Sequence, residues 1–393
     1  MVYSCLIDIH TIFVPEILGA MNFQKYRNLI IIMIFAVSVT TPLIAMILKL
    51  DRSPLLRENR EHAAFPDIAL DRKTLKKFPH DFYAYFRDNF GFRDDFIRLN
   101  FLVKRTILKE LEFNDVLFGK DGWLYYLGEK EMDDSRGITH YDEETLARWA
   151  ASLERKRQWL AARGIRYLFV IAPNKASIYR ENLPSYFRDL HDPTGLDEFV
   201  QYVRAHTGVD LVDLRPALLT AKTIERSYMK TDTHWNEFGA FVAYQEIMET
   251  LSRWFPATHS ETFADYVMER KMGSGGDLAI MVGGSEFIRE EEIFLVPKKA
   301  RNAREIEVNT KEKFLAMYQD EQVLPRALVF RDSFFDALIP FISEQFQYAR
   351  FYRHHWDESI PVAAAINSIH PDVVIEEFVE RQIKFGMGDF SLQ

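Results

Sequence analysis

The sequence contains little cysteine and no surplus of positive charge. Its 393 residues include one cysteine, Cys5, which excludes a disulfide framework and a cysteine-based zinc site. The sequence has 49 Lys and Arg residues and 58 Asp and Glu residues, which gives a formal net charge of −9. A general nucleic-acid binder needs excess basic residues to neutralise phosphates, so we do not expect a nucleic-acid partner. With 48% hydrophobic and 27% charged residues, the composition is typical of a folded protein.

One stretch of the chain, residues 28–48, has no charged residue at all. About 20 apolar residues in a helix cross a hydrocarbon core of roughly 30 Å, and the proline at position 42 is tolerated in membrane helices. Because no small-residue cleavage site clearly follows the stretch, we expect an uncleaved transmembrane signal anchor. Basic residues lie on both sides of it, so the charges do not decide its orientation. The predicted first part of the chain is residues 1–50, a cytoplasmic stub with this helix.

The remaining chain divides by pattern into two further parts. Residues 51–140 are expected to form a connecting region, with helical spacing of aromatic residues over 77–111 that is interrupted at Gly91. Residues 116–128 predict a β-hairpin in this region. From residue 141 to residue 393, helices alternate with β-rich runs, which indicates an α/β domain with a parallel sheet flanked by helices. Ligands bind such sheets at the carboxyl ends of the strands.

The element boundaries in the third part follow from capping residues and hydrophobic periods. A Gly-rich and charged insertion between residues 260 and 309 fits no strand–helix rhythm. Helices are expected at 142–164 and 196–206, and a buried strand at 165–174. A strand followed by a turn is expected over 208–219 and again over 326–334, and a β-branched run that becomes polar near its end over 372–381.

Two short segments carry residues suited to acyl-transfer chemistry. In TDTHWNEFG, Asp232 precedes His234 by two residues at a predicted loop-to-helix junction, where a carboxylate can orient an imidazole. In VFRDSFF, Ser333 lies where a predicted strand enters a helix, and the helix N-terminus would offer N–H groups to an oxyanion. Serine, histidine and aspartate together are the parts of a nucleophilic site.

Each segment alone has a simpler interpretation. Ser333 in isolation is most simply a helix N-cap. Asp232 and His234 could be a surface pair or two metal ligands, with Asp332 as a third ligand. The nucleophile hypothesis is favoured because both segments lie at predicted strand-to-helix junctions.

The order of several segments resembles a known hydrolase superfamily. GIRYLFVIAPNK, VDLVDL and TDTHWNEFGAFVAY resemble the last strands and the Asp/His block of SGNH hydrolases. In ordinary members the Gly-Asp-Ser block comes first, whereas here RDS at residues 331–333 follows the Asp/His block. This circularly permuted order resembles the alginate O-acetyltransferase-like family of bacterial periplasmic proteins, which act on exopolysaccharides. Matching segments extend over roughly residues 57–390.

The resemblance implies roles for individual residues and no metal or organic cofactor. It implies that Ser333 is the nucleophile, His234 the general base and Asp232 its orienting partner. The chain departs from the superfamily at Arg331, which replaces the glycine of Gly-Asp-Ser, and at the strand end EEFVER, which replaces a Gly-x-Asn-Asp block. The oxyanion donors beyond Ser333 are therefore open. The substrate-binding candidates are Asn174, Lys175, Trp235, Arg331 and Arg381.

Most of these candidates have competing structural interpretations. Asn174 and Lys175 could contact a polysaccharide or merely cap a strand, and the same holds with less weight for Tyr179 and Arg180. The run 275–277, Gly-Gly-Asp, could cover the site or form a tight turn. Residues 354–356, His-His-Trp, could line a sugar groove, but a solvated loop with one packed aromatic residue is favoured.

The function that the resemblance implies is O-acetylation of an extracellular or cell-wall polysaccharide. The expected location is the bacterial inner membrane, with one span and the catalytic domain in the periplasm or cell envelope. Because acetyl-CoA is cytoplasmic, the expected donor partner is an integral-membrane acyltransferase. The alternatives are a carbohydrate acetylesterase with the same triad and a non-catalytic polysaccharide-binding assembly subunit.

Overall fold

The computed structural model describes residues 23–48, 50, 62–68, 71–356 and 362–386. The predicted stub at residues 1–20 lies outside these ranges. The chain forms two compact units, Met1–Ile97 and Arg98–Gln393. The expected three-part division, with boundaries after residues 50 and 140, stays a prediction.

The first unit contains the apolar helix. Helix α1, Phe23–Leu48, includes a segment from Tyr26 to Leu48 that is long and apolar enough to cross a membrane. Helix α2, Arg72–Asn89, begins after Asp71, whose carboxylate accepts hydrogen bonds from the N–H groups of the first turn. Helix α3, Arg93–Leu102, follows after a break at Gly91, as the sequence predicts.

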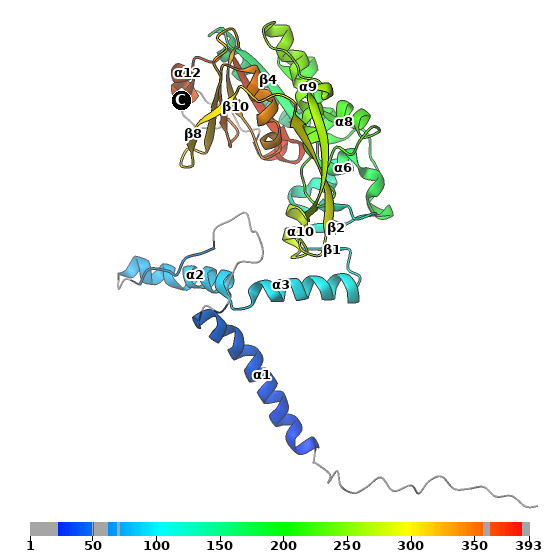
Figure 1. Ribbon diagram of the computed structural model, residues 1–393, viewed down its shortest axis with the longest axis vertical. Coiled ribbons are helices and arrows are strands. Elements are labelled where there is room, and N and C mark those ends of the chain that lie inside the picture. The colour runs from blue at the N-terminus through cyan, green and yellow to red at the C-terminus, as the bar shows by residue number, and fades with distance from the viewer. Residues whose placement is uncertain (1–22, 49, 51–61, 69–70, 357–361, 387–393) are drawn as a thin grey trace, which may run out of the picture. The chain divides into compact units, whose positions relative to one another are not determined.

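The second unit is built on a seven-stranded sheet with the order β5-β4-β12-β10-β11-β9-β8. Strands β4, β10 and β8 of this sheet are labelled in Figure 1. The five strands from β5 to β11 pair in parallel, whereas β9 and β8 extend the sheet antiparallel. The predicted parallel α/β sheet is therefore confirmed, with an antiparallel extension that the sequence did not predict. The strands are β4 Arg166–Ala172, β5 Asp210–Asp213, β8 Arg304–Asn309, β9 Phe314–Tyr318, β10 Arg326–Phe330, β11 Tyr348–Tyr352 and β12 Val373–Val379.

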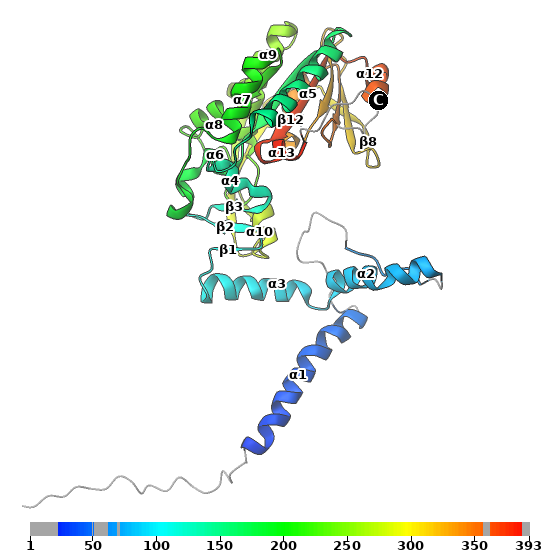
Figure 2. The same ribbon diagram turned by 180° about the vertical axis from the view of Figure 1, so that it is seen from behind.

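Helices cover both faces of this sheet because its strands are apolar on both sides. In β4, Leu168 and Val170 face one core cluster, while Phe169 and Ile171 face the other. The first cluster includes α8, Arg215–Ala221, α9, Glu237–Trp254, and α11, Ile339–Ile342. The second includes α5, Glu143–Ala161, α7, Gly195–His206, and α12, Val362–Ile369 (Figure 2). The Asp142 carboxylate caps α5 by accepting the Thr145 N–H at 2.8 Å, as predicted.

Smaller elements lie around the sheet. The predicted hairpin is confirmed as β2, Val116–Phe118, and β3, Leu124–Tyr126, which pair antiparallel beside β1, Glu112–Phe113. The Gly-rich and charged insertion between residues 260 and 309 forms a long antiparallel hairpin. Its strands are β6, Tyr266–Ser274, and β7, Arg289–Pro297, and the short helix α10, Asp277–Met281, lies between them in the sequence. Three other short helices are α4 Glu131–Ser135, α6 Lys175–Ile178 and α13 Ile383–Gly386. A π-turn covers Val103–Ile107, and 3₁₀ turns cover Gly128–Lys130, Arg180–Asn182, Ser185–Phe187, Phe263–Asp265, Phe334–Ala337, Ser343–Gln345 and Glu380–Gln382.

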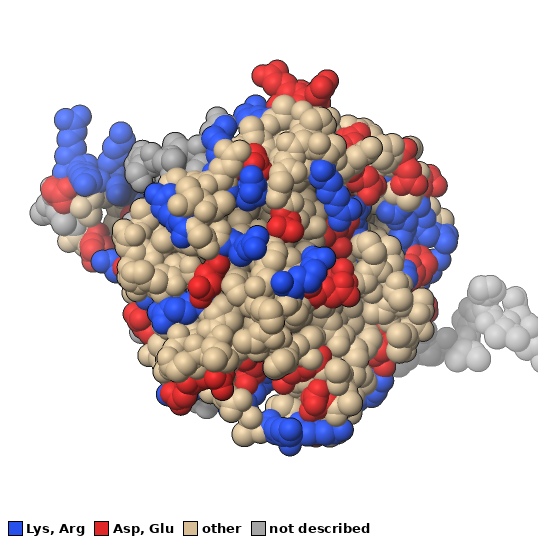
Figure 3. All heavy atoms as spheres, turned by 90° about the horizontal axis from the view of Figure 1, so that it is seen from above, with Lys and Arg blue, Asp and Glu red and all other residues tan. Residues whose placement is uncertain are grey.

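Charges of both signs are intermixed on the face seen in Figure 3, with broad uncharged areas between them. An electrostatic footprint for a polyanion would instead gather Lys and Arg on one face. The visible face therefore carries no extended field of one sign.

Candidate active site

Ser333 lies at the carboxyl end of β10, in the middle of the sheet. The sequence predicts that an α-helix follows directly, but the structure has the 3₁₀ turn Phe334–Ala337 and then the single turn of α11. Pro340 explains the difference, because it lacks the N–H that a continuous α-helix would bond to the Asp336 carbonyl. The oxyanion-binding α-helix N-terminus expected behind Ser333 is therefore absent.

The Ser333 hydroxyl does not cap this turn. Instead, the Asp332 carboxylate accepts the Phe334 N–H at 2.8 Å and the Val379 N–H at 2.7 Å. Ser333 thus occupies the N-cap position of the turn, but its hydroxyl does not make the capping hydrogen bond. Its neighbour performs the capping, and the Ser333 Oγ is left to contact His234.

Ser333, His234 and Asp232 form one hydrogen-bonded line. The His234 Nε2 lies 2.8 Å from the Ser333 Oγ, and its Nδ1 lies 2.6 Å from the Asp232 Oδ1. The His234 backbone N–H also donates to the Asp232 Oδ1, at 3.0 Å, which orients that carboxylate. The His234 side chain remains 28% exposed, so this part of the line is open to solvent.

The loop that carries Asp232 and His234 is held from two sides. The buried Lys175 ammonium donates to the Met229 carbonyl at 3.3 Å, the Lys230 carbonyl at 3.2 Å and the Asp232 carbonyl at 2.5 Å. From β7, the Glu290 carboxylate accepts the Lys230 N–H at 2.5 Å and the Thr231 N–H at 2.9 Å. Burial lowers the pKa of Lys175 to about 8, although nearby carboxylates oppose the shift. The buried Lys175 thus holds the loop through its backbone carbonyls and does not lie on an open surface.

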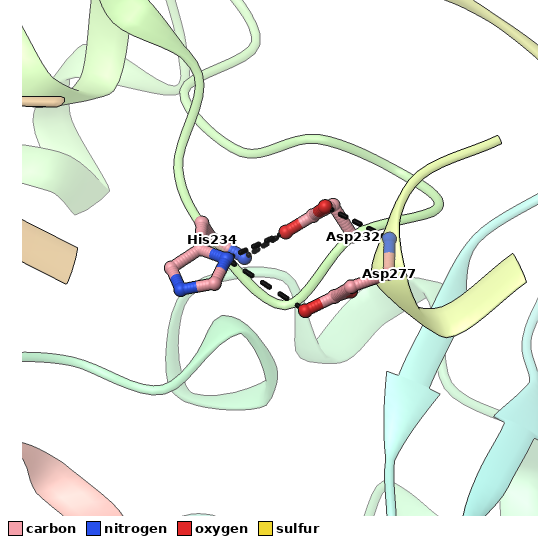
Figure 4. A group of neighbouring side chains, drawn as sticks. All are labelled: Asp232, His234 and Asp277. Carbon is pink, nitrogen blue, oxygen red and sulfur yellow. Dashed lines mark hydrogen bonds and ion pairs between the residues drawn. The ribbon is translucent and has the colours of Figure 1, made fainter. Parts of the chain in front are cut away.

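Asp277 adds a second carboxylate to the site (Figure 4). Its N–H donates to the Asp232 Oδ2 at 2.9 Å, its Oδ1 accepts the Thr233 N–H at 2.7 Å, and its Oδ2 lies 3.7 Å from the His234 Nδ1. A Cβ on the preceding Gly276 would come within 2.6 Å of the Asp232 Cβ, so only glycine allows this approach. The Gly-Gly-Asp run at residues 275–277 was considered as a possible cover of the site, but its contact with Asp232 was not predicted from the sequence.

The charges of these groups shift one another's protonation. Burial opposes ionisation of Asp232, but the His234 hydrogen bond and charge outweigh it and lower the Asp232 pKa to about 2. Burial would lower the pKa of His234, yet the hydrogen bond and charge of Asp232, with the charge of Asp277, raise it above its ordinary value. Arg381 acts in the opposite direction on the His234 pKa. Burial and the Asp232 charge raise the pKa of Asp277.

Asp232, His234 and Asp277 also offer ligand atoms that lie within 4.8 Å of one another, a spacing at which they could coordinate a metal ion. Two tetrahedral ligands about 2.0–2.2 Å from an ion lie about 3.3 Å or more apart. The 2.6 Å between the His234 Nδ1 and the Asp232 Oδ1 is shorter and has the length of a charge-assisted hydrogen bond. Asp332, the predicted third ligand, has its two oxygens bonded to backbone N–H groups. The geometry therefore fits a shared proton better than a metal ion.

Asn174 and Arg381 meet beside the site, at the ends of β4 and β12. The Arg381 Nη1 donates to the Asn174 Oδ1 at 3.4 Å, and its guanidinium lies over the Phe334 ring, 5.4 Å from the centroid. Glu129 and Glu131 pair with the same guanidinium at 3.1 and 3.5 Å. The Asn174 Nδ2 is buried and has no hydrogen-bond partner among the described residues.

The remaining candidates make internal contacts. Arg331 is 5% exposed and pairs with the Asp336 carboxylate at 2.5 Å. Trp235 is 2% exposed and packs edge-on against Phe334, with ring centroids 5.1 Å apart. Neither side chain lies on an open surface.

Four secondary candidates also lie in packing positions. The Tyr179 hydroxyl contacts the Ser227 backbone N–H at 2.8 Å, and Arg180 donates to the Ser135 carbonyl. His355 stacks on Phe378 with centroids 3.7 Å apart, and Trp356 is buried against Phe330. A cavity of about 780 Å³ lies elsewhere, between α8, α9 and the β6–β7 hairpin, and no triad residue lines it.

Comparison with known proteins identifies the family. Residues 116–319, just over half of the chain, match the model of the SGNH hydrolase-like domain of the acetyltransferase AlgX. The chain belongs to this family. The predicted resemblance and fold class are confirmed. The match includes Asp232, His234 and Asp277 but ends before Ser333, whose assignment rests on the geometry.

Relatives of known name and structure agree with this membership. The chain is 30% identical to the probable alginate O-acetylase AlgJ of Pseudomonas aeruginosa over 174 residues, which are 42% of this chain and 41% of the relative. The structure of Bacillus cereus PatB1 with a sulfonyl adduct matches with a TM-score of 0.54 and 18% identity, over 72% of this chain and 99% of that one. A DHHW family protein from Eubacterium siraeum matches with a TM-score of 0.51 and 16% identity, over 69% and 93% of the chains. At these identities the two structures show a shared fold.

Proposed function

We propose that this protein transfers acetyl groups to hydroxyls of a polysaccharide through Ser333, His234 and Asp232. The observation that carries the proposal is the line from the Ser333 Oγ through the His234 imidazole to the Asp232 carboxylate, with contacts of 2.8 and 2.6 Å. Such a line converts a weak hydroxyl nucleophile into an active one. Membership of an acetyltransferase family supports acetyl as the transferred group. The name of the AlgJ relative supports a polysaccharide as the acceptor.

In the first half of the reaction, the His234 Nε2 takes the proton of the Ser333 hydroxyl. The Ser333 Oγ attacks the acetyl carbonyl carbon, and the tetrahedral intermediate collapses when the donor oxygen leaves with the proton from His234. Asp232 holds the Nδ1 proton of His234 and stabilises the imidazolium. The product is an acetyl ester on Ser333.

In the second half, a sugar hydroxyl gives its proton to the His234 Nε2 and attacks the Ser333 ester. Collapse of the second intermediate breaks the bond to the Ser333 Oγ, which recovers the proton. The exposed end of His234 allows the acceptor to approach. Water at the same position would give acetate, which is the esterase outcome.

Two donors are suited to the oxyanion in both steps. The Ser333 backbone N–H finds no acceptor among the described residues. The Asn174 Nδ2 is a buried donor that lacks a partner within the described part of the chain, and a ligand oxygen would satisfy it. One oxyanion donor lowers the activation free energy by about 3 kcal/mol. We therefore assign Asn174 to the oxyanion, and Lys175 to support of the Asp232 loop.

Asp277 is a positioning residue in this proposal. Its N–H and carboxylate hold Asp232 and Thr233, while its charge favours protonated His234. Arg381 disfavours that form, but the pKa of His234 is raised overall. Asp277 and Arg381 therefore act in opposite directions on the pKa that burial and Asp232 mainly determine.

The proposed location is the bacterial inner membrane, with the catalytic unit in the periplasm. The length and apolarity of α1 support a single span. The placement on the envelope side follows from the resemblance of the sequence to a family of periplasmic proteins. An integral-membrane acyltransferase is the proposed acetyl donor partner.

The test is a transfer assay with the purified full chain. We expect an activated acetyl ester plus an unacetylated uronic-acid oligosaccharide to yield acetylated oligosaccharide. Acetate release that is unaffected by the oligosaccharide, without acetylated product, would establish the esterase instead. Absence of both products with a detergent-solubilised, folded chain would favour the non-catalytic subunit.

A further inference from the structure

We propose that α2 is an interfacial helix, whose aromatic face enters the lipid headgroup region while its basic residues contact anionic headgroups. The proposal goes beyond acetyl transfer and concerns how the chain meets the membrane. It rests on α1 as a bilayer span and not on the chemistry of Ser333.

The apolar face of α2 is continuous and partly open. Its members recur at spacings of three and four residues, which places them on one side of the helix. Phe82 stacks between Phe78 and Phe86, with centroids 5.7 and 6.4 Å away. Leu75 is 54% exposed and Phe82 37% exposed, although Phe65 packs edge-on against Phe82. The face consists of Leu75, Phe78, Phe82, Tyr85 and Phe86.

The charge of α2 is opposite to that of the whole chain. The helix contains five Lys and Arg residues and two Asp residues, a net charge of +3, whereas the chain carries −9. Four of the basic residues, Arg72, Lys73, Lys76 and Lys77, lie in its first two turns and are exposed. No ion pair to these four is found in the described part of the chain. Basic residues next to an apolar helix face complement an anionic lipid surface.

A glycine contact places the end of α2 beside the end of α1. Gly91, two residues after α2, packs against the Pro42 carbonyl, and a Cβ on Gly91 would come within 2.7 Å of the Ala45 Cβ and 2.9 Å of the Met46 N. These three partners belong to the last turns of the candidate span Tyr26–Leu48. The end of a membrane span lies at the headgroup level. Helix α2 is therefore tethered where an aromatic and basic helix binds best.

Aromatic side chains with basic neighbours favour lipid over protein as the occupant of this face. Tyr and Phe rings are accommodated at the headgroup boundary, and each Lys or Arg near an anionic surface adds about 1 kcal/mol of attraction. A soluble protein with the same open aromatic strip would be exposed to aggregation. The bilayer that α1 spans would cover the aromatic face of α2 and so remove this exposure.

The test uses the full chain reconstituted in vesicles, with single fluorophore labels in a Cys5→Ser background. Leu75→Cys places the label on the apolar face, and Lys73→Cys is the matched control on the opposite face, two residues away. In vesicles of phosphatidylcholine and phosphatidylglycerol, we expect lipid-linked nitroxides near the glycerol level to quench the Leu75 label several-fold more than the Lys73 label. Aqueous iodide should show the reverse order.

Two controls separate the possible failures. Resistance of the chain to carbonate extraction reports whether α1 spans the bilayer, independently of α2. Lys73→Ala, Lys76→Ala and Lys77→Ala combined should remove the dependence of Leu75 quenching on phosphatidylglycerol. Equal iodide access at both labels would overturn the proposal. Protection of Leu75 from iodide without lipid quenching would also overturn it, because a protein surface would then cover the face.

Discussion

The two halves of the candidate site are supported in different ways. On the Ser333 side, the support comes from the central sheet. The Asp332 carboxylate accepts the N–H of Val379, the last residue of β12, and the Glu377 carboxylate of β12 accepts the Asp332 N–H at 3.0 Å. On the His234 side, a loop without regular structure is held by Lys175, by Glu290 of β7 and by Asp277 of α10. The sheet thus positions the nucleophile. The position of the base depends on Lys175 and on the insertion, and the insertion residue Asp277 adds to the effect of Asp232 on the pKa of His234.

The largest effect is expected at the nucleophile. Ser333→Ala should lower kcat by at least about 1,000-fold, because the attacking atom is removed. The matched control is Ser343→Ala, a buried serine ten residues further along the same segment. The rate of oligosaccharide acetylation measures both. A Ser333→Ala variant that keeps more than a tenth of the wild-type rate would contradict the assignment.

An intermediate effect is expected at the support of the base. Lys175→Met removes one hydrogen-bond donor from each of three loop carbonyls and should lower kcat about 100-fold, because a displacement of the loop by about 1 Å misplaces His234. The control is Lys156→Met, which removes another buried lysine, paired with Glu376 at 2.8 Å on the other side of the fold. Breaking that pair should lower the free energy of unfolding by about 3–5 kcal/mol.

The comparison between these two variants separates support of the site from general stability. Denaturant unfolding gives the stability of each variant, and kcat is measured for the folded fraction. We expect Lys156→Met to keep its kcat within about tenfold, despite its loss of stability. Equal losses of kcat in the two variants would show that the His234 loop has no special dependence on Lys175.

The smallest effect is expected on the pH profile. The rising limb of kcat/KM reports loss of the proton from His234 in the free enzyme. Asp277→Asn removes a charge that raises the His234 pKa, so the limb should move to lower pH, while the plateau rate changes less than about tenfold, or 1.4 kcal/mol. Arg381→Gln removes a charge that lowers the same pKa, so its limb should move to higher pH. Shifts in the same direction would contradict this electrostatic account.

Local signals in the sequence were sufficient for the parallel strands β4, β5, β10 and β12 and for three members of the candidate site, Asp232, His234 and Ser333. The apolar run of β4, the Asp142 cap and the Gly91 break each depend on neighbouring residues, and each is confirmed. The spacing of Asp232 and His234 and the strand before Ser333 pointed to the same edge of the sheet, where the structure brings the three side chains together.

What the sequence missed depends on contacts between distant segments. Lys175 lies 57 residues from the Asp232 carbonyl that it holds, and no pattern near Lys175 reveals this contact. The insertion looked irregular because β6 alternates weakly and is mostly exposed. Asp277 meets Asp232 only because the β6–β7 hairpin and Gly276 bring them together. Burial of Asn174 and Trp235 likewise results from tertiary packing.

The most direct test of the central claim is capture of the acetyl group on the protein. The full chain is mixed with an activated acetyl ester, quenched in acid, digested and analysed by mass spectrometry. We predict one added acetyl group on the peptide that contains Ser333 in the wild type, and none on that peptide in Ser333→Ala or His234→Gln. An acetyl group on a different residue, or an oligosaccharide-acetylating protein whose Ser333 never carries acetyl, would contradict the account.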